Sequence, residues 1–256
     1  MKSQVLCVLL LFTTVWIFGC TGNQVTAPDT QLALASPGLE QVATQNPGVI
    51  PPNANPYGKS YAEWSIDWWQ WLASAPLDQN PGLDETGEFV DWGQSGPVWF
   101  LAPNFGGVSV RDAIVPPGTA LFIDVTAFET STREGHGTTE EELRGTAAYV
   151  VGLMENLSCE IDGVAVEMLE AYRTQSSEMF SLTVPDDNVF DLWGVPTDAG
   201  TYYPSVADGY YVMVAPLSVG NHTIHLHGEI PDFEYVTDVT FHLTVINRGG
   251  RQTIAD

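Results

Sequence analysis

Basic side chains are scarce in this sequence of 256 residues. There are 8 Lys and Arg against 32 Asp and Glu, which gives a formal net charge of −24. This charge repels phosphate, and it argues against nucleic acids and anionic membrane surfaces as partners of the protein body. Hydrophobic residues make up 44% and aromatic residues 11% of the sequence, so the chain is acidic but not disordered. It has enough apolar surface for a full-sized core.

Cysteine is rarer still, with three residues, Cys7, Cys20 and Cys159. We expect Cys7 to leave with an export signal and Cys20 to carry lipid. Cys159 then remains alone in an alternating apolar–polar segment, where it is expected to be a small buried hydrophobe. The mature chain therefore cannot form a disulfide framework, although an extracytoplasmic compartment would allow one.

Motifs for nucleotide cofactors and hydrolytic nucleophiles are also missing. The sequence has no phosphate-binding glycine loop, no dinucleotide fingerprint and no His-Glu-x-x-His pair. The proline of Gln94-Ser95-Gly96-Pro97 precludes a nucleophile elbow that runs into a helix. With 32 acidic residues, no single carboxylate pair for glycoside hydrolysis stands out. We assign no catalytic residue, and no cofactor apart from the metal discussed below.

The N-terminus is expected to carry an export signal. Lys2 precedes a largely apolar run of 14 residues, 5–18, which is short for a membrane span but typical of a signal peptide. Ile17-Phe18-Gly19-Cys20 resembles the lipobox of bacterial lipoproteins, in which a peptidase cuts before a cysteine that is then diacylated. The resemblance implies a signal peptide over 1–19 and lipidation at Cys20. The alternative is an ordinary secretory signal and a fully secreted protein.

Residues 20–57 are expected to join the lipidated cysteine to the body as a flexible tether. They are rich in Thr, Gln, Asn, Pro, Ala and Gly and contain almost no charge. Acyl chains on one residue would hold the protein stably at a membrane. By the same lipoprotein resemblance, Thr21 rather than Asp after the cysteine favours the outer membrane or the cell surface.

Residues 58–248 are predicted to form a single mainly β domain, followed by a disordered tail over 249–256. Short strand patterns separated by turn signals favour an antiparallel, jelly-roll-like β-sandwich with two packed α-helices. The last two strands, 222–229 and 236–246, are expected to pair. Other strands are expected at 97–102, 107–115, 119–125, 158–161, 164–168, 178–184 and 209–215.

Two capping boxes predict where the helices begin. Ser60-x-x-Glu63 starts a helix to about Ala73 with four tryptophans in eight residues. We interpret Trp64, Trp68 and Trp71 as core, with a sugar-stacking surface as the alternative. Thr138 or Thr139 starts a second helix, whose apolar positions at helical spacing are expected at Ala147, Val150, Val151, Met154 and Leu157. Between the last strand before it and this helix, Arg133–Gly137 mixes acidic and basic groups and is expected to be a mobile turn.

Several segments resemble a family of uncharacterised secreted bacterial and archaeal proteins. The resemblance spans residues 57–246. It rests on Tyr57-Gly58-Lys59-Ser60-Tyr61, Trp68-Trp69-Gln70-Trp71, Gly93-Gln94-Ser95-Gly96-Pro97-Val98-Trp99-Phe100-Leu101, Val115-Pro116-Pro117-Gly118-Thr119-Ala120-Leu121-Phe122, Tyr172-Arg173 and Pro216-Leu217-Ser218-Val219-Gly220-Asn221-His222-Thr223-Ile224-His225. The family pattern has two cysteines near the positions that Val90 and Ala113 occupy here, which implies a disulfide that this chain lacks. The family has no agreed activity, so the resemblance implies a domain and no mechanism.

Histidines form the best cluster of candidate ligands. Four of the 5 His lie in the last two strands. Period-2 geometry places His225, His227 and His242 on one outward face, while His222 sits at a turn and is expected to bond the backbone there. If His242 faces His225 or His227, the three could hold Zn or Cu, with Glu229 or Asp238 as a supporting carboxylate. The alternative is a set of locally bonded surface histidines.

Three functional hypotheses follow. The favoured one is a non-enzymatic cell-envelope lipoprotein with a binding domain, for which an extracellular glycan is a candidate ligand. Trp92, Tyr202 and Tyr203 would contact the glycan if they form an exposed row. The alternatives are a secreted polysaccharide hydrolase or lyase and an extracytoplasmic Zn- or Cu-binding protein. The sequence does not specify an oligomeric state.

Overall fold

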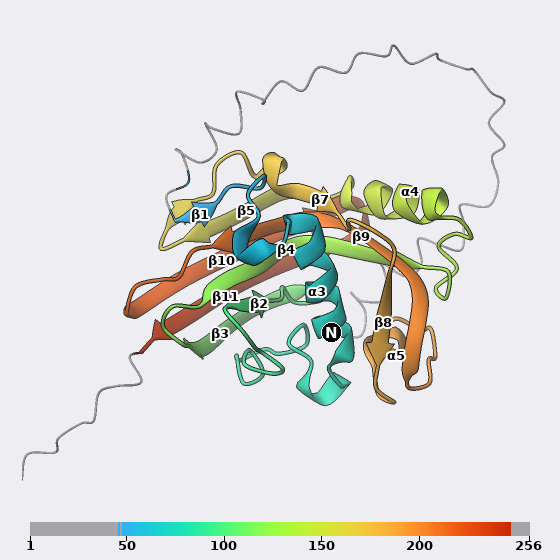
Figure 1. The fold of residues 1–256 in the computed structure, drawn as a ribbon, viewed down its shortest axis with the longest axis horizontal. Coiled ribbons are helices and arrows are strands. Elements are labelled where there is room, and N and C mark those ends of the chain that lie inside the picture. Colours follow the sequence, from blue (N-terminus) through green and yellow to red (C-terminus); the bar gives the residue numbers. More distant parts are fainter. Residues whose placement is uncertain (1–45, 47, 247–256) are drawn as a thin grey trace, which may run out of the picture.

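The structure, a computed structural model, describes residue 46 and residues 48–246. Within them the chain forms a β-sandwich of two sheets with a few helices, as Figure 1 shows. The helices are α3 (Tyr61–Ser74), α4 (Glu140–Val151) and the short α5 (Val189–Leu192). Short 3-10 turns lie at Pro56–Gly58, Leu77–Gln79, Leu169–Tyr172 and Pro231–Phe233. Among the described residues, no helix has the length and hydrophobicity needed to cross a membrane.

The six-stranded sheet is built around one long strand, β9 (Gly200–Val214). Its order is β1 (Val49–Ile50), β9, β4 (Ala120–Ser131) and β2 (Val98–Leu101). Two further strands, β7 (Arg173–Gln175) and β8 (Phe180–Val184), also pair with β9. All these pairs are antiparallel except β2–β4, which is parallel.

The five-stranded sheet contains the histidine-bearing strands. Its order is β3 (Gly107–Val115), β11 (Tyr235–Val245), β10 (Gly220–Ile230), β5 (Glu155–Ile161) and β6 (Val164–Ala165). The antiparallel pairing of β10 with β11, Ile224 opposite Phe241, confirms the expected pairing of the last two strands. β3 instead runs parallel to β11, so both sheets contain one parallel pair in an otherwise antiparallel arrangement.

Helix α3 forms an aromatic layer of the core. Its N-terminus has the predicted capping box between Ser60 and Glu63. The tryptophans at 64, 68, 69 and 71 are all buried, and Trp68 is only 1% exposed. The indole N–H of Trp68 donates to the Leu101 carbonyl at 3.2 Å, and that of Trp69 donates to the Tyr211 hydroxyl at 2.9 Å. Because these ring faces and N–H groups are used inside the protein, the core interpretation is confirmed.

Strands β4 and β9 are longer than predicted. The apolar patterns suggested 119–125 and 209–215, but the strands extend to Ser131 and begin at Gly200. The added stretches contain the buried acids Glu129 and Asp208, which broke the apolar pattern. Asp208 lies in the sheet because the Arg173 guanidinium contacts both of its oxygens, at 3.0 and 3.1 Å.

Two other predicted boundaries differ. Helix α4 begins after its Thr139 cap as expected but ends at Val151, with Gly152 as C-cap, so Met154 follows the helix and Leu157 belongs to β5. Strand β1 pairs with Val214 and Met213 of β9, which places the end of the predicted tether 20–57 in the folded body. The predicted signal peptide, Cys20 and the predicted tail 249–256 lie outside the described residues. Cys159 is buried as expected, and burial raises the pKa of its thiol to about 12.

Candidate functional site: the open face of the five-stranded sheet

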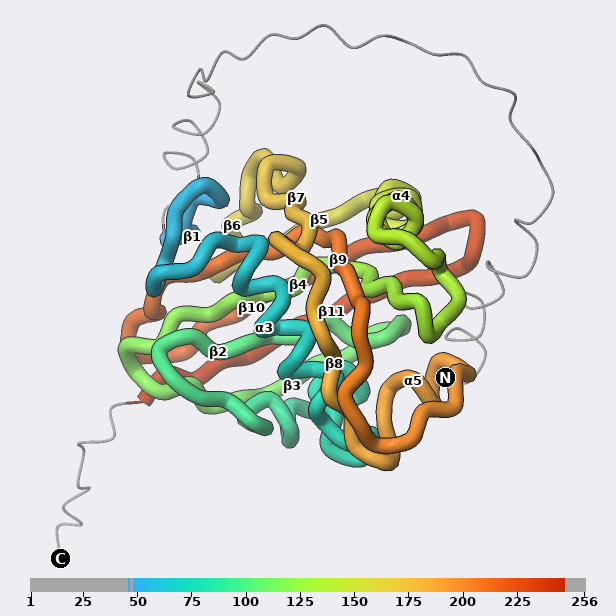
Figure 2. The backbone as a smooth tube through the Cα atoms, turned by 45° about the vertical axis from the view of Figure 1, so that its right-hand side comes forward, coloured from blue at the N-terminus to red at the C-terminus, as the bar shows by residue number. Residues whose placement is uncertain are grey.

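The outer face of the five-stranded sheet carries the histidines. Helices α3 and α4 both pack against β4 and β9 of the other sheet, as Figures 1 and 2 show. Along β10, Ile224 and Leu226 are buried while His225 and His227 are partly exposed, and β11 alternates in the same way around Phe241. The period-2 prediction of outward histidines is therefore confirmed. We call this surface the open face.

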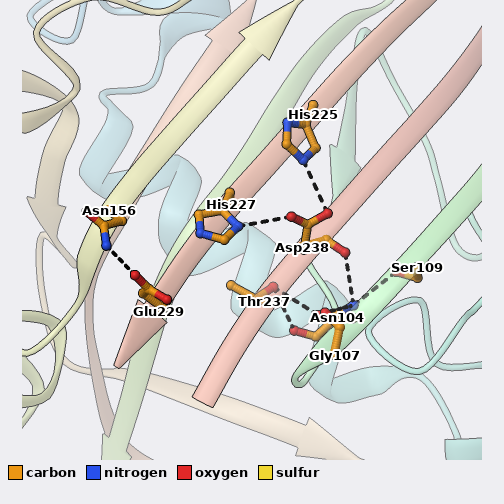
Figure 3. Close-up of polar contacts among 9 residues, drawn as sticks. All are labelled: Asn104, Gly107, Ser109, Asn156, His225, His227, Glu229, Thr237 and Asp238. Carbon is orange, nitrogen blue, oxygen red and sulfur yellow. Dashed lines mark hydrogen bonds and ion pairs between the residues drawn. The ribbon is translucent and has the colours of Figure 1, made fainter. Parts of the chain in front are cut away.

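Asp238 lies between two histidines at the centre of the open face. His227 is directly opposite Asp238 in the β10–β11 register, and its Nδ1 is 3.0 Å from Oδ2. The Nε2 of His225 is 3.2 Å from the other carboxylate oxygen, Oδ1 (Figure 3). When Asp238 is ionised, each neutral ring donates one N–H to it. The second nitrogen of each ring is then an acceptor, available to a hydroxyl donor or a metal.

The backbone beneath Asp238 is held by a buried polar group. The side-chain amide of Asn104 donates to the Ser109 hydroxyl at 3.0 Å and to the Gly107 carbonyl at 3.1 Å. The Thr237 hydroxyl donates to the Asn104 side-chain oxygen at 2.9 Å (Figure 3). These bonds tie the start of β11 to β3, so the carboxylate rests on a fixed strand. Further along β10, Glu229 accepts from Asn156 of β5 rather than from a histidine.

His242 does not face His225 or His227. It lies opposite Thr223, and its Nδ1 is 3.3 Å from Asp112 of β3. The sequence could not show this, because the third histidine's place depends on register and on the parallel neighbour β3. The His242–Asp112 pair lines a hollow of about 390 Å³ at the end of the face, together with Gly87, Glu88, Val90, Asp91, Ala113, Ile114 and Thr244.

His222 bonds locally, as expected. Its Nδ1 is 2.7 Å from Asp162 Oδ2, and its Nε2 is 2.9 Å from the Ser218 carbonyl oxygen. Partial burial would lower the His222 pKa, but the bonds to Asp162 and Ser218 outweigh it and raise the pKa. His222 is therefore a structural residue of the β5–β10 edge.

The structure leaves metal binding as a prediction. Within residues 48–246, no three His, Cys, Asp or Glu side chains are arranged to hold a metal ion. His225 and His227 converge on one carboxylate, whereas His242 has a carboxylate of its own. A metal would have to use the ring nitrogens that Asp238 does not contact, with Asp238 orienting both rings.

The three aromatic candidates do not share the open face. Trp92 lies in the loop before β2, where its carbonyl accepts from the Trp71 indole at 2.8 Å. Tyr202 and Tyr203 are consecutive on β9, so they point to opposite sides. Arg133 covers the Tyr202 ring, with its guanidinium 4.4 Å from the ring centroid, while Tyr203 is 61% exposed.

A buried acidic cluster was missed by the sequence analysis. Glu129 of β4 is 3% exposed, and the side chains of Glu134 and His136 are 6% and 5% exposed. The predicted turn over Arg133–Gly137 is present, but it folds back onto β4, so the Glu134 and His136 side chains are buried. The sequence signal for this cluster was an acidic residue, Glu129, among apolar residues. It could be recognised as buried only if the strand was known to continue past Val125.

Comparisons with known proteins identify no family. No family model and no curated protein matches the chain. A crystal structure of a cysteine protease inhibitor from Entamoeba histolytica aligns with 58% of this chain and 96% of its own, with 13% sequence identity and a TM-score of 0.23. A likeness this low carries no argument about function.

Proposed function

We propose that this protein is an exported, lipid-anchored binding protein of the cell envelope, and that the open face is its ligand surface. The observation that supports this most is the His225–Asp238–His227 arrangement on the five-stranded sheet, whereas α3 and α4 pack against the six-stranded sheet. Two fixed acceptor nitrogens on such a face are suited to recognition. The lipobox-like segment that ends at Cys20 supports the anchor.

A glycan is the ligand class that we propose. A neutral imidazole that donates to a carboxylate is a good acceptor for a sugar hydroxyl, and the outward Thr240 of β11 adds a hydroxyl that can donate or accept. The strongly acidic body does not repel a neutral glycan. Trp92, Tyr202 and Tyr203 lie elsewhere, so none of them would add to these hydrogen bonds.

The hydrolase hypothesis receives less support. It needs two carboxyl groups that flank a bound substrate. One pair of glutamates that the structure brings together, Glu129 and Glu134, is buried and so cannot flank a bound substrate. Zn or Cu binding remains a second candidate, favoured by the two histidines that Asp238 orients.

The test is a glycan-binding screen with the full-length protein, followed by variants on each candidate surface. We expect His225→Ala and His227→Ala each to weaken binding at least tenfold, because each removes an acceptor. Tyr203→Ala is the matched control on the other sheet and should bind like the wild type. Loss of binding in Tyr203→Ala with retention in both histidine variants would move the site to β9. No binding to any glycan would contradict this ligand class.

A further inference from the structure

Three ionisable side chains meet inside the protein where β4 ends and the connection to α4 begins. Glu129 lies on β4, and Glu134 and His136 lie on residues 132–138, which we call the latch segment. The Ser131 hydroxyl donates to Glu134 Oε2 at 2.7 Å, and His136 Nδ1 is 3.5 Å from the same oxygen. The open face does not involve this cluster.

Glu129 is the unusual member of the cluster. Both of its oxygens are fully buried without a hydrogen-bond donor at bonding distance among the described residues. Its neighbours are the Glu134 carboxyl group and the Ser205 hydroxyl. A buried carboxylate beside a second carboxylate is strongly disfavoured, and a proton between the two carboxyl groups removes both the repulsion and the missing bond.

Within residues 48–246, no Lys or Arg side chain forms an ion pair with Glu129 or Glu134. Arg133 points away, with its guanidinium donating to the Thr197 hydroxyl at 2.7 Å and to the Pro196 carbonyl at 2.9 Å. On α4, the Glu142 carboxylate accepts from Thr138 and Thr139, and Arg144 pairs with Glu140 at 2.8 Å. On β9, Asp208 is already held by Arg173. The groups that face Glu129 and Glu134 are therefore His136, Ser131 and Ser205.

We propose that Glu129 and Glu134 share a proton that holds the latch segment closed over β4, and that loss of this proton opens the segment. The closed segment is also tied to the rest of the fold by the Thr146 hydroxyl, which donates to the His136 carbonyl at 2.9 Å. Arg133 of the same segment lies over the Tyr202 ring. Opening of the latch segment therefore exposes this aromatic ring. The protonation of Glu129 and Glu134 thus controls access to Tyr202.

The direction of the pH effect follows from the raised pKa values of Glu129 and Glu134. Burial raises the pKa of Glu134 to about 7 and, with the adjacent Glu134, that of Glu129 well above its usual range. A carboxyl group with a raised folded-state pKa stabilises the closed state fully below its ordinary value near 4.5, and this stabilisation falls as pH rises through about 7. Burial lowers the His136 pKa to about 4, so His136 protonation opposes closure only on the acid side.

The test is amide hydrogen exchange of the full-length protein at pH 6, 7 and 8, corrected for the intrinsic exchange rate. From Glu134 alone, protection of residues 132–138 should fall about tenfold between pH 6 and pH 8. Peptides from the β10–β11 pair should keep their protection. Equal protection of the latch segment at both pH values would overturn the proposal.

Variants separate the shared proton from a general effect of pH. In Glu129→Gln the amide can donate to an ionised Glu134, so the pH effect should fall below about twofold. Glu141→Gln, an exposed acid of α4, is the matched control and should keep the tenfold change. A tenfold change retained in Glu129→Gln would overturn the proposal. Should that variant not fold, infrared spectroscopy of the wild type decides, because a protonated carboxyl band must be present at pH 6 and weaken by pH 8.

Discussion

Asp238 determines how the rings of His225 and His227 are oriented on the open face. Its two oxygens contact His227 at 3.0 Å and His225 at 3.2 Å, so one carboxylate sets the orientation of both rings. A histidine that ligates a metal commonly donates its other N–H to such a carboxylate. Outward placement of the histidines could be predicted from the alternation of β10. The choice of Asp238 as their partner depends on the β10–β11 register, which alternation does not define.

For these individual side chains, we predict weak transition-metal binding that depends on His227. Calorimetric titration of Zn or Cu into chelator-treated protein should give a Kd between roughly micromolar and millimolar, about −8 to −4 kcal/mol. His227→Ala should abolish it, and Asp238→Asn should weaken it about 10- to 100-fold. Binding should also release protons from the protein, because only a neutral imidazole ligates a metal.

His242→Ala is the control for metal binding, since His242 is paired with Asp112 away from the other two rings. Binding that is unchanged in His227→Ala, or that is lost equally in His242→Ala, would rule out this pair as the ligand set.

Helix α3 links distant elements through its side chains. The Tyr61 hydroxyl donates to the Ile50 carbonyl of β1 at 2.6 Å and accepts from the Met213 amide of β9 at 3.0 Å. The position of this helix was predictable, because its capping box and tryptophan spacing are local signals. The lengths of β4 and β9 were not, because their buried acids are stabilised by partners far along the chain, such as Arg173 for Asp208.

Replacement of Trp68 tests the packing of this element. Trp68→Ala should lower the free energy of unfolding by about 3–5 kcal/mol, because it leaves a cavity and an unpaired Leu101 carbonyl. Urea denaturation followed by circular dichroism measures the loss. Asp67→Asn, next on the helix and paired with Lys59 at the surface, should change stability by less than about 1 kcal/mol. A fully stable Trp68→Ala protein would show that this indole is not part of the core.

The whole molecule combines a strongly acidic body with a lipobox-like N-terminus. A net charge of −24 favours solubility and distance from anionic head groups. An anchor must then come from acyl chains rather than from charge. The fold class could be predicted from composition and turn spacing. The parallel strand pair in each sheet could not be predicted, because β3, for example, pairs with β11, about 130 residues later in the sequence.

Lipidation at Cys20 is the prediction for the molecule as a whole. The wild type should partition into detergent and carry a diacylglyceryl modification by mass spectrometry. Cys20→Ser should remain unprocessed by lipoprotein signal peptidase or be released as soluble protein. Cys7→Ser, within the expected signal peptide, should still be anchored. An unmodified mature N-terminus downstream of residue 20 would contradict the anchor.

The parallel pairing of β3 with β11 also affects folding during synthesis, because β3 is made long before its partner strand. Gly107 pairs with Thr237 and Val115 with Val245, so β3 has no sheet partner on this side until the last strand has been made. Chains grow at roughly 5–20 residues per second, so β3 remains without this partner for about 6 to 26 seconds. Val108, Val110 and Ile114 are exposed even after folding, so the unpaired β3 strand presents apolar side chains that favour aggregation. We therefore expect nascent chains of this protein to be prone to associate with one another until β11 is available.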